Sequence, residues 1–231
     1  MIVRDRPSGL KLFLLLRGSV LQQIWKVLLI NVLLATLVTF THGVLFSQKI
    51  TLTAIPFTLI GLPLAIFLGF RNTAAYDRYW EARKLWGELL LRCRNLSRQC
   101  QSLINLPQPV QPGAGRDDIR VRMVHRAIAF CHALRQQLRG VPDRGEVQAL
   151  LQPPEWQALQ RSGSQTTLLM HHMGLDLQHC LRNGHIGEPL AASIDNTLSA
   201  LVNAAASCER IKSSPVPFSY TLLLHRTAYM Y

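Results

Sequence analysis

The side chains best suited to chemistry gather in one short stretch, which contains His171, His172, His179 and Cys180. Histidine and cysteine are common ligands of zinc and other transition metals. Two ligands on one helix reach the same ion when they lie three or four residues apart, because that spacing puts them on one face. His171 and His172 are adjacent, and His172 and His179 are two turns apart. This spacing does not favour a metal site, and we predict none.

Acidic residues are few, with 13 Asp and Glu among 231 residues, and none form a convincing pair for general acid–base catalysis. Asp77 and Glu81 have the i, i+4 spacing, but Arg78 stands between them, which is typical of a helix face with salt bridges. The sequence also lacks the glycine-rich loops, nucleophile motifs and metal motifs of common enzyme classes. We therefore predict that the protein is not an enzyme and uses no cofactor.

The five cysteines are Cys93, Cys100, Cys131, Cys180 and Cys208. Their number is odd, and no two of them have the CxxC spacing of a redox or zinc motif. We interpret each as a small buried apolar residue in a reducing compartment, without disulfides.

An apolar set with helical spacing offers a different kind of function. Leu62, Ile66 and Phe70 recur every four residues, so they lie on one helix face and rise over about 12 Å. Around a symmetric pore such side chains would form stacked apolar rings, and a constriction of this kind gates by losing its water. The same stripe could instead face lipid or a neighbouring helix, and the spacing alone favours that reading.

The stripe lies within the second of two long apolar segments, Val27–Phe46 and Leu52–Phe70, which contain no Asp, Glu, Lys or Arg. As helices both would extend about 30 Å, which is the thickness of the hydrocarbon core of a bilayer. Basic residues are frequent outside the two segments, whereas only Lys49 lies between them. The positive-inside rule therefore places both outer flanks, and with them the N-terminus, in the cytoplasm.

The rest of the chain predicts amphipathic helices, because apolar residues recur near the 3.6-residue period between breaks at Pro, Gly or Asn. The predicted helices cover Asn72–Asn105, Ile119–Leu138, Glu146–Leu151, Glu155–Arg161, Gln165–Arg182 and Glu188–Ile211. No strand is predicted. The expected fold class is an all-α membrane protein, in which transmembrane helices continue into a cytoplasmic helical bundle.

These elements divide the chain into a cytoplasmic N-terminal segment (1–26), two transmembrane helices (27–70) and a cytoplasmic helical domain (71–215). The apolar run over 216–231 has the composition of a third transmembrane helix of which only the start is present. We therefore expect a chain that is truncated before its last transmembrane helices.

The chain is strongly basic, with a formal net charge of +12. Such a balance is typical of proteins that bind nucleic acid or the surface of an anionic membrane. The two apolar segments favour the membrane, because they must be buried before any nucleic acid can be bound. We expect the lipid bilayer as a partner and no nucleic acid.

Several motifs occur together in an order that resembles the bacterial bestrophin family. The longest run is AIFLGFRN at 65–72, which is followed by EAR at 81–83 and LWG at 85–87. CERI at 208–211 and PVPF at 215–218 stand near the end of the chain. The resemblance extends over most of the chain and is weakest between about Leu106 and Gly184.

The resemblance implies a bestrophin-like ion channel of the bacterial inner membrane, assembled as a homopentamer around one central pore. Leu62, Ile66 and Phe70 match the positions that line the apolar neck of the family's pore. A second constriction of the family lies at the cytoplasmic exit, and counting back without gaps from Cys208 puts it at Pro189, with Leu190 beside it. Family members often have isoleucine there, so Pro189 is a departure.

The expected function is therefore passive flux of monovalent ions, either cations or chloride, since apolar rings do not select the sign of charge. The alternative is a membrane-anchored scaffold or accessory protein that keeps the fold but passes no current. The resemblance also implies two further transmembrane helices beyond residue 231, and the acidic calcium-binding segment of animal members would lie there too.

Overall fold

The computed structural model describes residues 21–40, 44–45, 48–49, 54–107, 115–142 and 145–215, and single positions between 217 and 226. The chain separates into two compact units, Met1–Leu59 and Ile60–Tyr231. Each unit is described by itself.

The first unit contains helix α2 (Leu21–Phe40) and two short antiparallel strands, β1 (Val44–Leu45) and β2 (Gln48–Lys49). Val44 pairs with Lys49 and Leu45 pairs with Gln48, so only two residues separate the strands. The prediction of a chain without strands is therefore wrong at this point. The sequence signal was weak because two-residue strands are too short to show an alternating pattern.

The predicted helix over Val27–Phe46 is shifted toward the N-terminus, because α2 begins at Leu21 and ends at Phe40. The sequence following Phe40 contains Gly43, which has a low helix propensity. The apolar part of α2, Ile24–Phe40, is shorter than the span that we predicted.

Helix α3 (Ala54–Leu103) is a single helix of 50 residues. The prediction that the second apolar segment continues directly into the next amphipathic helix is therefore confirmed. Pro63 lies inside α3 and lacks the N–H that would bond to the carbonyl of Leu59. Among the described helices, Thr58–Leu103 is the one long and apolar enough, by length and composition, to cross a membrane.

Four further helices follow in the second unit, close to the predicted positions. They are α4 (Ile119–Arg139), α5 (Pro153–Arg161), α6 (Gln165–Arg182) and α7 (Glu188–Ser213), with a short 3₁₀ helix η1 (Gln148–Leu150) between α4 and α5. Helix α5 begins at Pro153 rather than at Glu155, because proline is well tolerated in the first helical turn.

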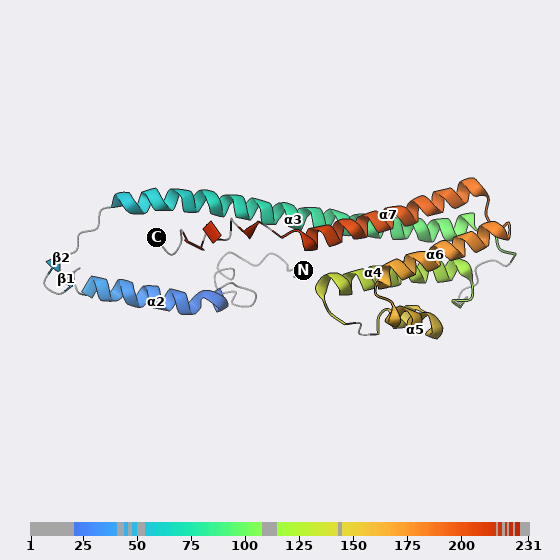
Figure 1. Ribbon diagram of the computed structural model, residues 1–231, viewed down its shortest axis with the longest axis horizontal. Coiled ribbons are helices and arrows are strands. Elements are labelled where there is room, and N and C mark those ends of the chain that lie inside the picture. The colour runs from blue at the N-terminus through green and yellow to red at the C-terminus, as the bar shows by residue number, and fades with distance from the viewer. Residues whose placement is uncertain are drawn as a thin grey trace, which may run out of the picture. The chain divides into compact units, whose positions relative to one another are not determined.

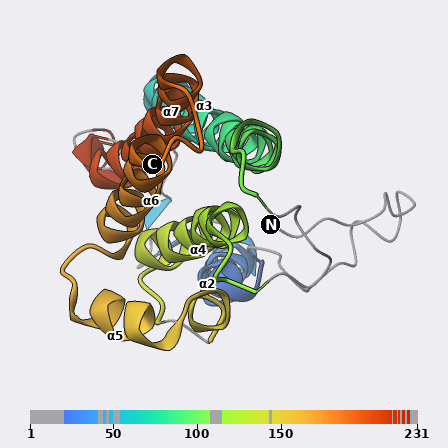
Figure 2. The ribbon, with the colours of Figure 1, turned by 90° about the vertical axis from the view of Figure 1, so that its right-hand side faces the viewer.

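These helices pack into a bundle with the second half of α3 (Figures 1 and 2). Helix α6 packs against α4, α5 and α7, and Figure 2 shows α5 to one side of α4 and α6. Each of α3, α4, α6 and α7 supplies buried side chains to the core of this bundle. Examples are Leu89 and Leu96 of α3, Phe130 of α4, Met173 of α6 and Leu201 of α7.

The ends of α4 follow from local residue types. At its N-terminus, Asp118 is the N-cap and accepts a 2.8 Å hydrogen bond from the backbone N–H of Arg120. At its C-terminus, Gly140 has φ +64°, a left-handed conformation that costs glycine little, and its N–H bonds to the last carbonyls of the helix.

Asp118→Ala should lower the free energy of unfolding by about 1–2 kcal/mol, because the cap is lost and the buried Arg120 guanidinium loses its carboxylate partner at 2.8 Å. The measurement is thermal unfolding of the purified protein in detergent. Asp117→Ala is the control, because Asp117 is exposed and accepts a hydrogen bond from the side chain of Gln152 instead of capping the helix. Equal shifts in the two variants would contradict the assignment of Asp118 as the cap.

The predicted third span, 216–231, lies partly outside the described residues. Of this run, Phe218, Tyr220, Leu222, Leu223, His225 and Arg226 are described and are helical.

Candidate functional site

The apolar stripe occupies one face of α3 within the second unit, and we refer to Leu62, Ile66 and Phe70 as the neck residues. Their relative exposures are 64%, 47% and 58%, so none of them belongs to the core of the bundle. Their side chains share a face because each is followed by the next after about one turn. The helix that presents them continues without interruption to Leu103, where it is anchored by the buried bundle.

The second predicted constriction lies at the start of α7, and we refer to Pro189 and Leu190 as the aperture residues. Gly187 is the N-cap of this helix, and its carbonyl accepts a hydrogen bond from the N–H of Leu190. Both aperture residues are exposed, whereas Ile186, just before the cap, is buried. The single chain therefore leaves the aperture residues uncovered, as it does the neck residues.

A network of charged side chains lies inside the bundle, where α4, α5 and α6 meet. It consists of Arg122, Arg126, Glu155, His172 and Asp176, which we call the charge network. Arg122 forms a forked contact with Asp176, with nitrogen–oxygen distances of 3.2 and 2.8 Å. Arg126 lies between both carboxylates, at 2.6 Å from Glu155 and 2.5 Å from Asp176. Two cations thus face two anions where the three helices meet, so removing one partner would leave a shielded charge without compensation.

Sequence reasoning missed this network, because its members are separated by up to 54 residues and come from different helices. The spacing of Asp77 and Glu81 also predicted salt bridges along one face of α3, whereas the structure pairs this part of α3 with α7. Glu81 pairs with Arg210 of α7 at 2.7 Å, and Arg78 donates a 2.6 Å hydrogen bond to the carbonyl of Ile211. These contacts join α3 to α7, which run side by side in both ribbon views.

The histidines of α6 have separate partners. His172 lies 3.1 Å from Glu155 through Nδ1, and His179 lies 3.0 Å from the side chain of Asn183. Among the described residues, no group of three or more His, Cys, Asp or Glu side chains is arranged to hold a metal ion.

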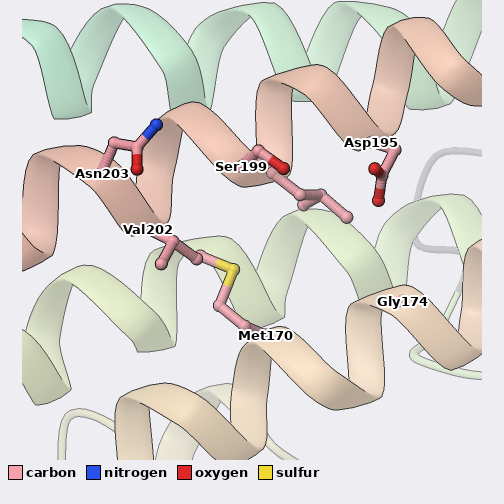
Figure 3. A pocket seen from close by; sticks show the side chains of 7 residues that line it. Met170, Gly174, Asp195, Ser199, Val202 and Asn203 are labelled. Carbon is pink, nitrogen blue, oxygen red and sulfur yellow. The ribbon is translucent and has the colours of Figure 1, made fainter.

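A shallow groove runs between α6 and α7 (Figure 3). Met170 and Gly174 line it from α6, and Asp195, Ser199 and Val202 line it from α7. Asp195 is the one carboxylate among the residues lining this groove, so the groove offers no acid–base pair.

His125 of α4 gives the bundle a pH dependence that can be measured. Burial, together with the nearby Arg116, lowers the pKa of His125 from its ordinary value of 6.5. The folded state therefore binds the proton less well than the unfolded state. The free energy of unfolding should hold its full value above pH 6.5 and decrease as the pH falls through the lowered pKa.

Thermal unfolding at several pH values between 7.5 and 5 tests this sign. His125→Gln should show a smaller loss of unfolding temperature over that range than the unmodified protein. His171→Gln is the control, because it removes a histidine that is exposed on α6 and lies outside the packed core. A profile of His125→Gln that follows the parent protein would exclude His125 as the source.

The chain is similar to known proteins in both sequence and fold. The pattern of the family described as Bacterial/Fungal Bestrophin protein matches residues 1–231. A voltage-dependent anion channel-forming protein of Ralstonia nicotianae is 37% identical over 231 residues, which is 100% of this chain and 73% of that protein. The voltage-dependent anion channel-forming protein YneE of Escherichia coli is 38% identical over 232 residues, again 100% of this chain and 73% of the relative.

Solved structures agree with the sequence comparison. The crystal structure of a bacterial bestrophin homolog from Klebsiella pneumoniae matches with a TM-score of 0.77 and 34% identity, over 88% of this chain and 72% of that one. A point variant of a bestrophin homolog from the same organism matches with a TM-score of 0.79 and 35% identity, over 92% and 74% of the two chains.

Apart from the short strands β1 and β2, the protein thus has the helical fold of a bestrophin-like membrane protein, and the fold class predicted from the sequence is confirmed. It belongs to the bacterial bestrophin family, which is a channel-forming family and not a family of enzymes. The resemblance and the prediction that the protein is not an enzyme are both confirmed by these matches.

Proposed function

We propose that the chain is a subunit of a homopentameric channel through which small monovalent ions diffuse passively. The observation that carries this proposal is the exposed apolar stripe of neck residues on a helix that is otherwise anchored in a well-packed bundle. An exposed apolar stripe within an apolar helix needs lipid or protein to cover it or a pore to line. The family to which the chain belongs favours the pore.

In the proposed pore, each turn of α3 between Leu62 and Phe70 contributes one apolar ring. Apolar rings cannot replace the water that an ion loses, so a narrow stack of them forms a barrier that depends on the pore's diameter. Pro63 lies next to the first ring, where its missing N–H leaves a backbone carbonyl free for water or a neighbouring helix. Gating would then consist of small changes in ring diameter.

The sign of the permeating ion depends on charged groups outside the neck. The relatives from Ralstonia nicotianae and Escherichia coli are named as anion channel-forming proteins. The chain's excess of basic over acidic residues, 25 against 13, would raise the concentration of anions near the pore mouths. Both observations favour chloride over sodium or potassium.

We also propose that the protein lies in the bacterial inner membrane, with its N-terminus and its helical domain, 71–215, in the cytoplasm. The aperture residues would form a second constriction where the pore leaves that domain. Lipid is the expected partner, and no binding to nucleic acid is expected.

Ion flux into liposomes that contain the purified full-length protein tests the proposal. Sodium, potassium and chloride are supplied one at a time, and reversal potentials under a salt gradient give the selectivity. Flux that depends on the protein supports the channel, and the reversal potential identifies its ion. Well-assembled oligomers without flux would contradict it and leave the membrane-anchored scaffold as the better description.

A further inference from the structure

Two cysteines on neighbouring helices lie unusually close to each other. The Sγ atoms of Cys93 on α3 and Cys131 on α4 are 3.5 Å apart, and we call these two residues the thiol pair. Both are half-buried, so the prediction that all five cysteines are buried is wrong for this pair. A separation of 38 residues in the sequence gives no hint of this contact.

The other three cysteines are in a different environment. Cys100, Cys180 and Cys208 are buried in the core. Burial raises the pKa of the Cys100 thiol to about 12 and that of the Cys180 thiol to about 11. At neutral pH these thiols stay protonated and shielded, and a protonated thiol is a poor nucleophile.

We propose that Cys93 and Cys131 are a site of reversible oxidation, at which a peroxide-class oxidant forms a disulfide that joins α3 to α4. Closing the sulfur–sulfur distance from 3.5 Å to the bond length of about 2.05 Å requires an approach of about 1.5 Å. A small rotation of the side chains and a small shift of the helices can supply this approach. The half-buried position of the pair lets a small oxidant reach it.

The reaction proceeds in two balanced steps. Cys93 loses its thiol proton, its thiolate attacks one oxygen of the peroxide, and the O–O bond breaks. The hydroxide that leaves takes up the proton that Cys93 lost, so a sulfenic acid and one water form. The Cys131 sulfur then attacks the sulfenic sulfur, the S–S bond forms, and a second water leaves. The two thiols lose two electrons and two protons, and the peroxide is reduced to two waters.

The order of these steps depends on which sulfur donates the hydrogen bond that the pair shares, and either atom can be the donor. With Cys131 as the donor, the hydrogen bond lowers the pKa of Cys93 and raises that of Cys131. Cys93 then attacks the oxidant and Cys131 resolves the intermediate, and the roles exchange when Cys93 is the donor.

The consequence of the disulfide follows from the continuity of α3. The same helix carries Cys93 in the bundle and the neck residues at its other end, so a covalent tie at Cys93 restricts how α3 can move against α4. An effect of this restriction on ion flow rests on the proposed function, whereas the disulfide itself does not.

Counting free thiols in the full-length protein tests the disulfide independently of any channel activity. The folded protein in detergent is treated with hydrogen peroxide, denatured, and labelled with a polyethylene glycol maleimide that retards migration for each free thiol. Oxidation should remove two labels from the five cysteines, and dithiothreitol should restore them. Cys208→Ser, which leaves the pair intact, should still lose two labels on oxidation.

Neither Cys93→Ser nor Cys131→Ser should lose two labels, because each variant keeps one thiol of the pair and can lose at most the one label that a sulfenic acid removes. Three results would overturn the proposal: a label count that oxidation does not change in the unmodified protein, a loss that dithiothreitol does not reverse, or a disulfide between two copies of the chain on a non-reducing gel. Loss of two labels in either single variant would also overturn it, because another cysteine would then be reacting.

Discussion

Replacing Ile66 by alanine is expected to raise ion flux severalfold without preventing assembly. Ile66 is the middle neck residue, and shortening it in every subunit widens the ring and lets water stay in the constriction. If the barrier at this ring falls by about 1.4 kcal/mol, the flux rises about tenfold. Folding should be unaffected, because the side chain is 47% exposed and takes no part in the core of the bundle.

The control for this experiment is Leu68→Ala on the same helix. Leu68 is 54% exposed, so its truncation costs the fold as little as that of Ile66. A position two residues away is rotated by about 200°, which turns it away from the face of the neck residues. Flux and reversal potential are measured for both variants in liposomes, and assembly is checked by size-exclusion chromatography.

The pattern across the two variants decides which face of α3 lines the pore. An effect of Ile66→Ala alone supports the stripe that we propose. An effect of Leu68→Ala alone would place the pore on the opposite face. If neither variant changes the flux through an active channel, this part of α3 is not its narrowest point.

Local signals allowed much of the bundle to be predicted. The acidic residue Asp118 and the left-handed Gly140 mark the two ends of α4, and both signals depend only on nearby backbone. The stretch after Phe70 has no proline and keeps the helical period, so the continuity of α3 was also visible in the sequence.

Contacts between distant residues were not visible in the same way. Helical periodicity indicates which face of a helix is buried, but it does not identify the helix that covers it. The pairing of Arg122 with Asp176 and the contact of Cys93 with Cys131 therefore appear only when the helices are assembled. The neck is an intermediate case, because its spacing also fits a face that touches lipid, and only the resemblance to bestrophins favoured the pore.

Replacing Asp176 by asparagine is expected to destabilise the helical bundle strongly. Asp176 accepts hydrogen bonds from both Arg122 and Arg126, and all three side chains are largely shielded from water. Asparagine has the same shape but no charge, so Arg122 would lose the carboxylate it contacts, and Arg126 would keep only that of Glu155. Breaking one partner of a buried ionic contact costs about 3–5 kcal/mol.

This cost should appear as a fall in unfolding temperature of about 6–20 °C, at about 2–4 °C for each kcal/mol in a domain of this size. Glu88→Gln is the matched control, since Glu88 pairs with Arg92 at 3.2 Å within α3, where both side chains are partly exposed. A partly exposed i, i+4 pair of this kind contributes about 0.5 kcal/mol or less, so the control should shift the unfolding temperature little. Similar shifts in the two variants would show that the buried network does not stabilise the bundle.

A second substitution separates the loss of a hydrogen bond from the burial of unpaired charge. If unpaired positive charge is the main cost of Asp176→Asn, then adding Arg122→Gln should recover part of the lost stability, because one of the two cations is removed. Arg122→Gln in the parent protein should instead destabilise, since Asp176 then loses one of its partners. A double variant that is less stable than Asp176→Asn alone would contradict this electrostatic account and assign the stability to the geometry of the hydrogen bonds.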